Sequence, residues 1–232
     1  MPDRAHDDDA RDAFILSHTE VAAPRLCPEI ALHLATELTT LWTVTEAWLA
    51  EHGVPPPYWA FAWAGGQALA RAVLDRPELV RGRAVLDFAS GSGIVAIAAA
   101  MAGAARVVAT DVDPVAVRAI GLNARRAEVA VEATSRDVID DPCARFDVVL
   151  AGDVCYEQPM SSRVLPWLAS LARAGKTVLI GEPGRTYAPA TGVEELARYE
   201  VETVADVEGV ARKIGRVLRV TSRPSRNGLR KL

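Results

Sequence analysis

The chain has 232 residues, of which 50% are hydrophobic, and its formal net charge is −4. That length supports one large domain with a sizeable core, and the composition excludes a chain that is disordered throughout. The acidic balance argues against a general nucleic-acid-binding protein, which would carry a strong positive charge.

Cysteine and histidine usage argues against disulfides and metals. The three cysteines, Cys27, Cys143 and Cys155, form no C-x-x-C pair, which indicates neither a disulfide framework nor a zinc site and fits a reducing compartment. The four histidines form no H-E-x-x-H pair, so no metal is expected. The sequence has no apolar run of about 18 residues and no signal-peptide core near its start, so we expect a soluble, cytoplasmic protein that does not enter a membrane. A monomer is the default expectation.

Composition divides the N-terminal quarter into two segments. Residues 1–15 hold the acidic run "DRAHDDDARD", which is typical of a flexible, solvated segment. Residues 16–53 have apolar positions at helical intervals between Pro28 and Glu51, which predict a helical extension of one or two helices. Gly53 and the prolines that follow end this extension.

Residues 54–221 have the alternating pattern of one α/β domain. After a helix that ends near Asp75, apolar runs of strand length alternate with helix-like runs, which predicts a doubly wound parallel sheet with helices on both faces. The predicted strands are residues 84–88, 106–110, about 129–133, 146–151 and 177–181, and the predicted helices are 94–102, 114–127 and 159–174. Valine-rich runs at 199–205 and 214–221 predict a hairpin-like antiparallel pair, and residues 222–232 predict a basic tail.

The stretch "VLDFASGSGIVAIAAA", residues 85–100, joins the first predicted strand to a helix. Gly91 and Gly93, with Ala96 three places on, fit the G-x-G-x-x-A spacing of a dinucleotide-binding turn. Such glycines let the backbone approach a ligand beyond the carboxyl end of the sheet. The spacing alone does not distinguish a dinucleotide from another nucleoside ligand.

Three carboxylates at predicted strand ends favour one ligand class. The Asp87 carboxylate would repel a pyrophosphate, but it would attract a ligand with an ammonium and a sulfonium group. Asp111 is placed to accept hydrogen bonds from both hydroxyls of a ribose, and Asp137 lies where an adenine amino group would be met. Asp111 could instead only cap the helix that begins at Pro114, and Asp137 could only hold a turn. Together they indicate S-adenosylmethionine, bound by Trp63, Asp87, Ala89, Ser90, Gly91, Gly93, Asp111, Val112 and Asp137.

Four segments carry a family resemblance: "PPYWAFAWAGGQALAR", "VLDFASGSG", "ATDVDP" and "FDVVLAGDVCYEQP". They closely resemble the seven-β-strand methyltransferases that modify lysine, with the nearest match among bacterial relatives of the electron transfer flavoprotein β subunit methyltransferase. The resemblance covers roughly residues 20–221. Two positions depart from the family pattern, Ala89 in place of the first glycine of the turn and Ala64 in place of a proline, and neither small residue is expected to abolish binding.

The resemblance implies a Rossmann-like sheet with strand order 3-2-1-4-5-7-6, in which strand 7 is antiparallel. It also implies S-adenosylmethionine as methyl donor, S-adenosylhomocysteine as product, and a lysine of the flavoprotein β subunit as acceptor. In "DVCY" it assigns Asp153 to hold the incoming ammonium and Tyr156 to bound the acceptor channel. Spacing alone favours a turn cap for Asp153 and a core position for Tyr156.

Several roles stay open at this level. We expect Trp63 to line the methionine end of the cofactor and Trp59 to pack in the core. Glu182 could attract a lysine or cap a loop, and Asn123 is left out of the site. The alternative functions are a small-molecule, nicotinamide-like N-methyltransferase and a ribosomal-protein methyltransferase. A binding protein without transfer activity fits less well because Asp153 and Tyr156 are present together with every cofactor acid. An NAD dehydrogenase fits less well because Asp87 stands at the strand end and no histidine or lysine of the later half lies in a motif.

Overall fold

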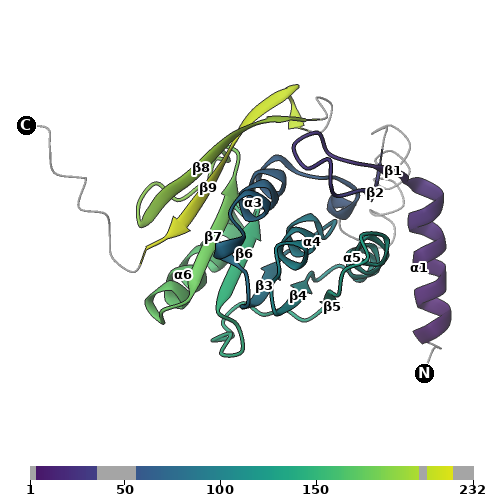
Figure 1. Ribbon diagram of the computed structural model, residues 1–232, viewed down its shortest axis with the longest axis horizontal. Helices are drawn as coiled ribbons and strands as arrows, with labels where there is room; N and C mark the ends of the chain where they lie inside the picture. Colours follow the sequence, from purple (N-terminus) through teal and green to yellow (C-terminus); the bar gives the residue numbers. More distant parts are fainter. Residues whose placement is uncertain (1–3, 36–55, 204–207, 222–232) are drawn as a thin grey trace, which may run out of the picture.

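The computed structural model describes residues 4–35, 56–203 and 208–221, and its centre is a seven-stranded sheet (Figure 1). The strand order is β5-β4-β3-β6-β7-β9-β8, in which β9 runs antiparallel to both of its neighbours. Counted from β3 as the first strand, this is the predicted order 3-2-1-4-5-7-6 with an antiparallel seventh strand. The strands are β3 (Ala84–Phe88), β4 (Arg106–Thr110), β5 (Glu132–Thr134), β6 (Val148–Gly152), β7 (Thr177–Glu182), β8 (Val193–Glu202) and β9 (Arg212–Val220).

Helices cover both faces of the sheet, as Figure 1 shows. Helices α3 (Ala64–Asp75), α4 (Ile94–Met101) and α5 (Pro114–Arg126) lie on one face, and α6 (Gln158–Arg173) lies on the other. Alternate strand residues divide between the two layers: Val85 packs in the cluster of α3 and α4, and Leu86 packs in the cluster of α6. Because both faces are buried, the central strands are continuous apolar runs, and this is why the sequence revealed them.

The order in which the chain adds strands reverses between the parallel neighbours β3 and β6. The chain passes from β3 to β4 on one side and later returns to β6 on the other, so the turns after β3 and β6 diverge and leave a crevice at the carboxyl ends of these strands. Helix α3 closes onto β7 through glycines, since a Cβ atom on Gly181 would overlap the Gly65 carbonyl oxygen. The double glycine therefore lets the start of α3 lie directly against the strand ends.

The predicted bounds are correct for β3 and β4 and shifted elsewhere. The strand expected at 129–133 lies at Glu132–Thr134, and β8 begins at Val193, six residues before the expected start. The short helices η1 (Tyr58–Ala60) and η2 (Pro77–Leu79) flank α3. No described helix is both long enough and apolar enough to span a bilayer.

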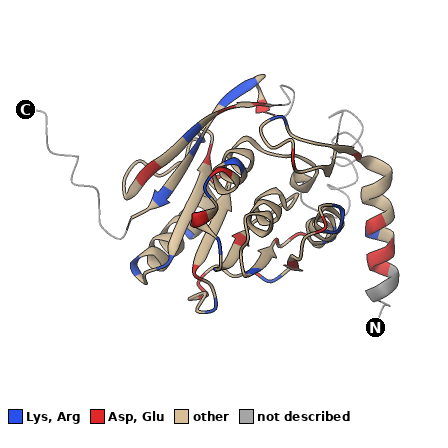
Figure 2. Cartoon of the chain, in the orientation of Figure 1, with Lys and Arg blue, Asp and Glu red and all other residues tan. Residues whose placement is uncertain are grey.

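The N-terminal region differs from its prediction. Residues 4–15, expected as part of a flexible acidic segment, belong to helix α1 (Arg4–His18), whose acidic residues are visible in Figure 2. Arg118 of α5 holds this helix, with Nη2 at 2.6 Å from Asp12 Oδ2 and Nη1 at 3.4 Å from Asp8 Oδ2. A cation on a distant helix balances these acids, and composition cannot show that pairing.

The helices expected between residues 28 and 51 are also corrected where the structure describes them. Strands β1 (Glu20–Ala22) and β2 (Leu32–Leu34) form an antiparallel pair, and the His33 N–H donates to Asn123 Oδ1 at 2.7 Å. The rest of the predicted helical extension, residues 36–53, and the basic tail, residues 222–232, lie outside the described residues. The domain boundaries stay predictions.

Candidate active site

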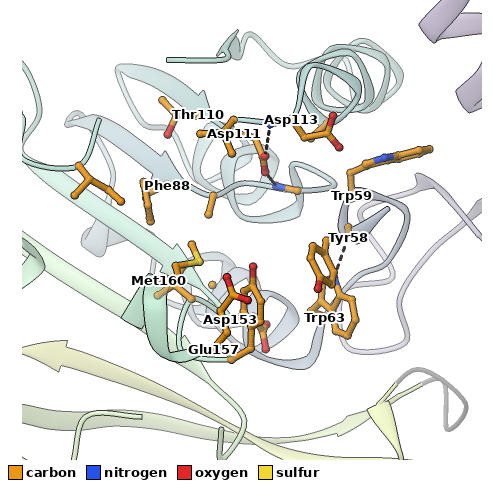
Figure 3. A pocket seen from close by; sticks show the side chains of 18 of the residues that line it. Tyr58, Trp59, Trp63, Phe88, Thr110, Asp111, Asp113, Asp153, Glu157 and Met160 are labelled. Carbon is orange, nitrogen blue, oxygen red and sulfur yellow. Dashed lines mark hydrogen bonds between the residues drawn. The ribbon is translucent and has the colours of Figure 1, made fainter. Parts of the chain in front are cut away.

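A cavity of about 650 Å³ lies at the carboxyl ends of β3, β4 and β6 (Figure 3). Its volume is within the range of pockets that hold a nucleoside-sized ligand. Eight of the eleven predicted site residues line it: Trp63, Ala89, Gly91, Asp111, Val112, Asp137, Asp153 and Tyr156. The crevice thus brings together residues that are up to 93 positions apart in the chain, from Trp63 to Tyr156.

The other three predicted residues, Asp87, Ser90 and Gly93, support the glycine turn and do not line the cavity. Asp87 is 1% exposed, and its Oδ2 accepts hydrogen bonds from the Ser90 hydroxyl and the Ala96 N–H, while its Oδ1 has no partner among the described residues. Burial raises the pKa of Asp87 to about 7. Asp87 therefore lies behind the cavity wall and supports the glycine turn.

Asp111 lines the cavity, and each of its carboxylate oxygens can accept a further hydrogen bond from a ligand. Its Oδ2 accepts from the Gly91 N–H at 2.9 Å and its Oδ1 from the Asp113 N–H at 3.1 Å, which leaves further lone pairs for two ligand hydroxyls. Asp113, not Asp111, caps α5, because Asp113 Oδ1 accepts from the Val115 N–H. The alternative that Asp111 only caps the helix is therefore wrong. Burial raises the pKa of Asp111.

Asp137 and Val112 lie on the part of the cavity wall that is most exposed to solvent. Asp137 Oδ1 accepts from the Ile139 N–H at 3.0 Å, so Asp137 both holds a turn and lines the cavity. Val112 is 69% exposed, and with Ile139 and Met160 it offers an apolar surface for a planar base.

Asp153 and Glu157 lie across the cavity from Asp111 and Asp113 (Figure 3). Asp153 has a positive φ of 56°, and its Oδ2 accepts from the Gly66 N–H, in the first turn of α3, at 2.7 Å. Its Oδ1 accepts from Arg185 Nη2 at 2.9 Å. Burial raises the pKa of Asp153 to about 6, although the Arg185 cation opposes that shift. Asp153 therefore bonds to other elements instead of capping its own turn.

The rings of Tyr58, Trp63 and Tyr156 form an aromatic group on the cavity wall. Tyr156 is 39% exposed and its ring centroid lies 5.4 Å from that of Tyr58, so Tyr156 is no core aromatic. Trp63 Nε1 donates to the Tyr58 carbonyl oxygen at 2.8 Å, and the two rings are 5.9 Å apart. Trp59 is 3% exposed and packs in a core cluster, as expected, although it also reaches the cavity.

Known proteins similar to this chain identify its family. The lysine methyltransferase of the electron transfer flavoprotein β subunit from Rattus norvegicus is 39% identical over 177 residues, which cover 75% of this chain and 68% of the rat protein. The Xenopus laevis enzyme of the same name is 40% identical over 176 residues, covering 75% of this chain and 70% of that protein. This chain belongs to the electron transfer flavoprotein β subunit lysine methyltransferase family.

Two coarser matches agree with that family. The model of the ribosomal protein L11 methyltransferase family (PrmA) matches residues 68–154. A crystal structure of a candidate RNA methyltransferase from Pyrococcus horikoshii aligns with a TM-score of 0.51 at 16% identity, over 66% of this chain and 83% of that one, which shows a shared fold. The PrmA match includes Asp87, Asp111 and Asp153 and ends before Tyr156.

Sequence reasoning missed two residues of this lysine methyltransferase site. Tyr58 lies in the quoted "PPYWAFAW" segment, where only the tryptophans were weighed. Arg185 follows β7 and lines the cavity because its loop folds back to Asp153. A cation just past the carboxyl end of a parallel strand was the available signal for Arg185.

Asn123 and Glu182 have supporting roles. Asn123 is fully buried and its Nδ2 donates to the Ser92 carbonyl oxygen at 2.8 Å, so it connects the glycine turn to β2. Glu182 is also fully buried and accepts from the N–H groups of Gly184 and Arg185, so it caps the loop after β7.

Proposed function

We propose that this chain transfers a methyl group from S-adenosylmethionine to a lysine ε-amine of the electron transfer flavoprotein β subunit. The observation that carries the proposal is that one cavity holds Asp111 beside the glycine turn on one wall and Asp153 with Tyr156 on the opposite wall. The names of the relatives supply the acceptor protein.

The residues of the first wall fit the proposed methyl donor. Asp111 has free lone pairs for a vicinal diol, and Val112 with Ile139 offers an apolar surface to adenine. When ionised, the Asp87 carboxylate behind the turn favours a ligand that carries an ammonium and a sulfonium group, and its Oδ1 has no hydrogen-bond partner among the described residues. When bound, S-adenosylmethionine supplies an electrophilic methyl group to the acceptor.

The second wall must deliver a neutral amine. A free lysine has a pKa of about 10.4, so deprotonating it near neutral pH costs roughly 4 to 5 kcal/mol. Asp153 accepts an N–H bond from the amine and directs its lone pair along the line of displacement. The ring of Tyr156 bounds the approach, and partial desolvation lowers the lysine pKa while water takes the proton.

The test compares three acceptors. The purified chain is incubated with methyl-labelled S-adenosylmethionine and either the flavoprotein β subunit, ribosomal protein L11 or nicotinamide. We expect label on a lysine of the β subunit, located by peptide mass spectrometry. Label found only on L11 would favour the activity suggested by the PrmA match, and label found only in the small-molecule fraction would favour the nicotinamide-like alternative. Either result would overturn the proposal.

We also propose that the enzyme acts as a monomer in a reducing cytoplasm. Its three buried cysteines are free thiols, which suits that compartment. Light scattering should give the mass of one chain, 24.8 kDa, and a mass of two chains would contradict the monomer.

A further inference from the structure

Arg185 places a permanent positive charge directly beside Asp153. The guanidinium donates through Nη2 to Asp153 Oδ1 at 2.9 Å, and its Nη1 lies 3.2 Å from Glu208 Oε2. The side chains of Arg185, Asp153 and Glu208 are 18%, 10% and 4% exposed. An ion pair this poorly solvated is screened much less than a surface pair, so its charges act strongly on any group that enters the cavity.

The group around Asp153 is balanced in charge. Glu208 also bonds Lys213 Nζ at 2.6 Å, so two carboxylates face two cations. The other charged or titratable groups nearby are Glu182 and Arg216 behind the β7 loop, Cys155, Tyr156 and Glu157 after β6, and Tyr58 across the cavity. Arg185 also lies over the Trp63 ring, with Cζ 5.6 Å from its centroid, which fixes the guanidinium at the cavity wall.

An unpaired carboxylate would work against the reaction. A negative charge within about 4 to 6 Å of an amine favours the protonated amine, and protonated lysine has no lone pair to attack with. A carboxylate that is already neutralised by a guanidinium still offers an oxygen lone pair for an N–H bond. It adds little net negative charge to the site.

We propose that Arg185 is a positioning residue that acts through Asp153: it balances the Asp153 charge, so that Asp153 orients the acceptor amine without stabilising its protonated form. This inference rests on the proposed lysine methyl transfer. It assigns to Arg185 a part in selecting the nucleophilic state of the acceptor, in addition to holding the loop after β7.

The test is the pH dependence of methyl transfer. Single-turnover rates are measured from about pH 6 to about pH 10, with enzyme in excess over the flavoprotein β subunit and saturating S-adenosylmethionine. For Arg185→Gln we expect the ascending limb to move up by about 1 pH unit or more, a loss of about tenfold at neutral pH, with recovery toward the wild-type plateau at high pH. Arg185→Lys keeps the charge and should follow the wild type. Binding of S-adenosylhomocysteine, measured by calorimetry, should change by less than about threefold in both variants, because the contacts of Asp111 are untouched.

Arg216→Gln is the matched control. It removes a guanidinium that bonds Glu182 Oε2 at 2.5 Å under the same loop and leaves the pair of Arg185 with Asp153 intact. This variant should melt at a lower temperature but keep the wild-type pH profile. A uniform loss in Arg185→Gln at every pH, an unshifted profile, or an equal shift in Arg216→Gln would each overturn the inference and leave the proposed function standing. A wild-type enzyme that labels no lysine at any pH would overturn both.

Discussion

The two walls of the cavity hold their carboxylates in different ways. On the wall after β3 and β4, Asp87 and Asp111 accept hydrogen bonds from backbone N–H groups and one serine hydroxyl. On the wall after β6 and β7, Asp153 accepts one backbone bond and one from the Arg185 guanidinium. Among the described residues no lysine or arginine forms an ion pair with Asp87 or Asp111, so the first wall is uncompensated when these carboxyls are ionised, whereas the Arg185 guanidinium balances Asp153 on the second.

This difference matches two chemical demands. A ligand that arrives with fixed positive charge is favoured by uncompensated carboxylates, since they attract it across the cavity. A ligand that must lose a proton before it reacts is hindered by net negative charge and helped by its absence. In the proposed reaction, the same residue type at equivalent strand ends therefore serves donor binding on the first wall, the donor wall, and acceptor deprotonation on the second, the acceptor wall.

Replacing Asp153 should give the largest effect. Asp153→Asn removes the charge that pairs with Arg185 and replaces one accepting oxygen with an N–H donor, so the amine loses its orienting partner and we expect methyl transfer to fall by at least about 100-fold, as misplacement of a reacting group does. S-adenosylhomocysteine affinity, measured by calorimetry, should change by less than about threefold. Asp147→Asn, at the opposite end of β6, is the control and should keep its activity. Loss of S-adenosylhomocysteine binding in Asp153→Asn would place this carboxylate on the donor wall instead.

Replacing Asp111 should weaken the donor wall alone. Asp111→Ala loses two hydrogen bonds from the ligand hydroxyls to a charged group, each worth about 1.5 to 3 kcal/mol, so we expect the Kd for S-adenosylhomocysteine to rise by at least about 100-fold. Asp113→Ala removes the helix cap, at a cost of about 1 kcal/mol of stability, with little change in Kd. Calorimetry and thermal melting separate the two, and equal Kd values for both variants would contradict the assignment of Asp111.

The two neighbouring glycines of α3 provide a steric test of the acceptor wall. A Cβ atom on Gly65 would overlap the Gly181 carbonyl oxygen and lie 2.6 Å from Asp153 Oδ2, whereas one on Gly66 would lie 4.0 Å from that oxygen. Gly65→Ala should therefore cost about 2 to 3 kcal/mol in urea unfolding and displace Asp153, with loss of transfer. Gly66→Ala should fold as well as the wild type. If both variants remain active, the contact between α3 and β7 does not set the position of Asp153.

The pH dependence of stability tests the charge of the donor wall. Asp87 has a pKa near 7 when folded and near 4 when unfolded, so the folded state holds an extra proton between these values and loses stability as pH rises through that window. Asp87→Asn lacks this loss. Its unfolding free energy relative to the wild type should therefore rise by about 2 kcal/mol between pH 5 and pH 7, as measured with urea. Ser90→Ala keeps the carboxyl group and removes a hydrogen bond that lowers its pKa, so this variant should lose at least as much stability as the wild type over the same pH range. Parallel pH profiles for Asp87→Asn and the wild type would mean that Asp87 is not held as a buried, uncompensated carboxyl.

Local sequence predicted those parts of the molecule that depend on local patterns. The bounds of β3 and β4 were correct because their apolar runs end at glycine and aspartate signals, and the strand order followed from the resemblance. Helix α1 was missed because its acids are paired by Arg118, more than 100 residues away. Strand β2 was taken for helix because its backbone bond to Asn123 is a tertiary contact.

For the site, the sequence identified the residue types but not which of them face the ligand. The position of Asp87 at a strand end indicated a site residue. Its carboxylate instead points into the turn, because it accepts hydrogen bonds from the Ser90 hydroxyl and from the Ala96 N–H at the start of α4. Arg185 had no motif of its own, because its role depends on how the loop after β7 folds back under the control of Glu182. Side-chain direction at a strand end is decided by such contacts, which no single-sequence pattern records.

Strand β8 lies at the end of the sheet order, and half of its ten residues are charged: Glu194, Glu195, Arg198, Glu200 and Glu202. A second copy that added itself to this edge would bring several glutamates against one another, which opposes strand addition. The charges of β8 therefore protect the β8–β9 hairpin against strand addition by a second copy. The outer edge of β8 still presents backbone N–H and C=O groups that a protein of different charge could bind.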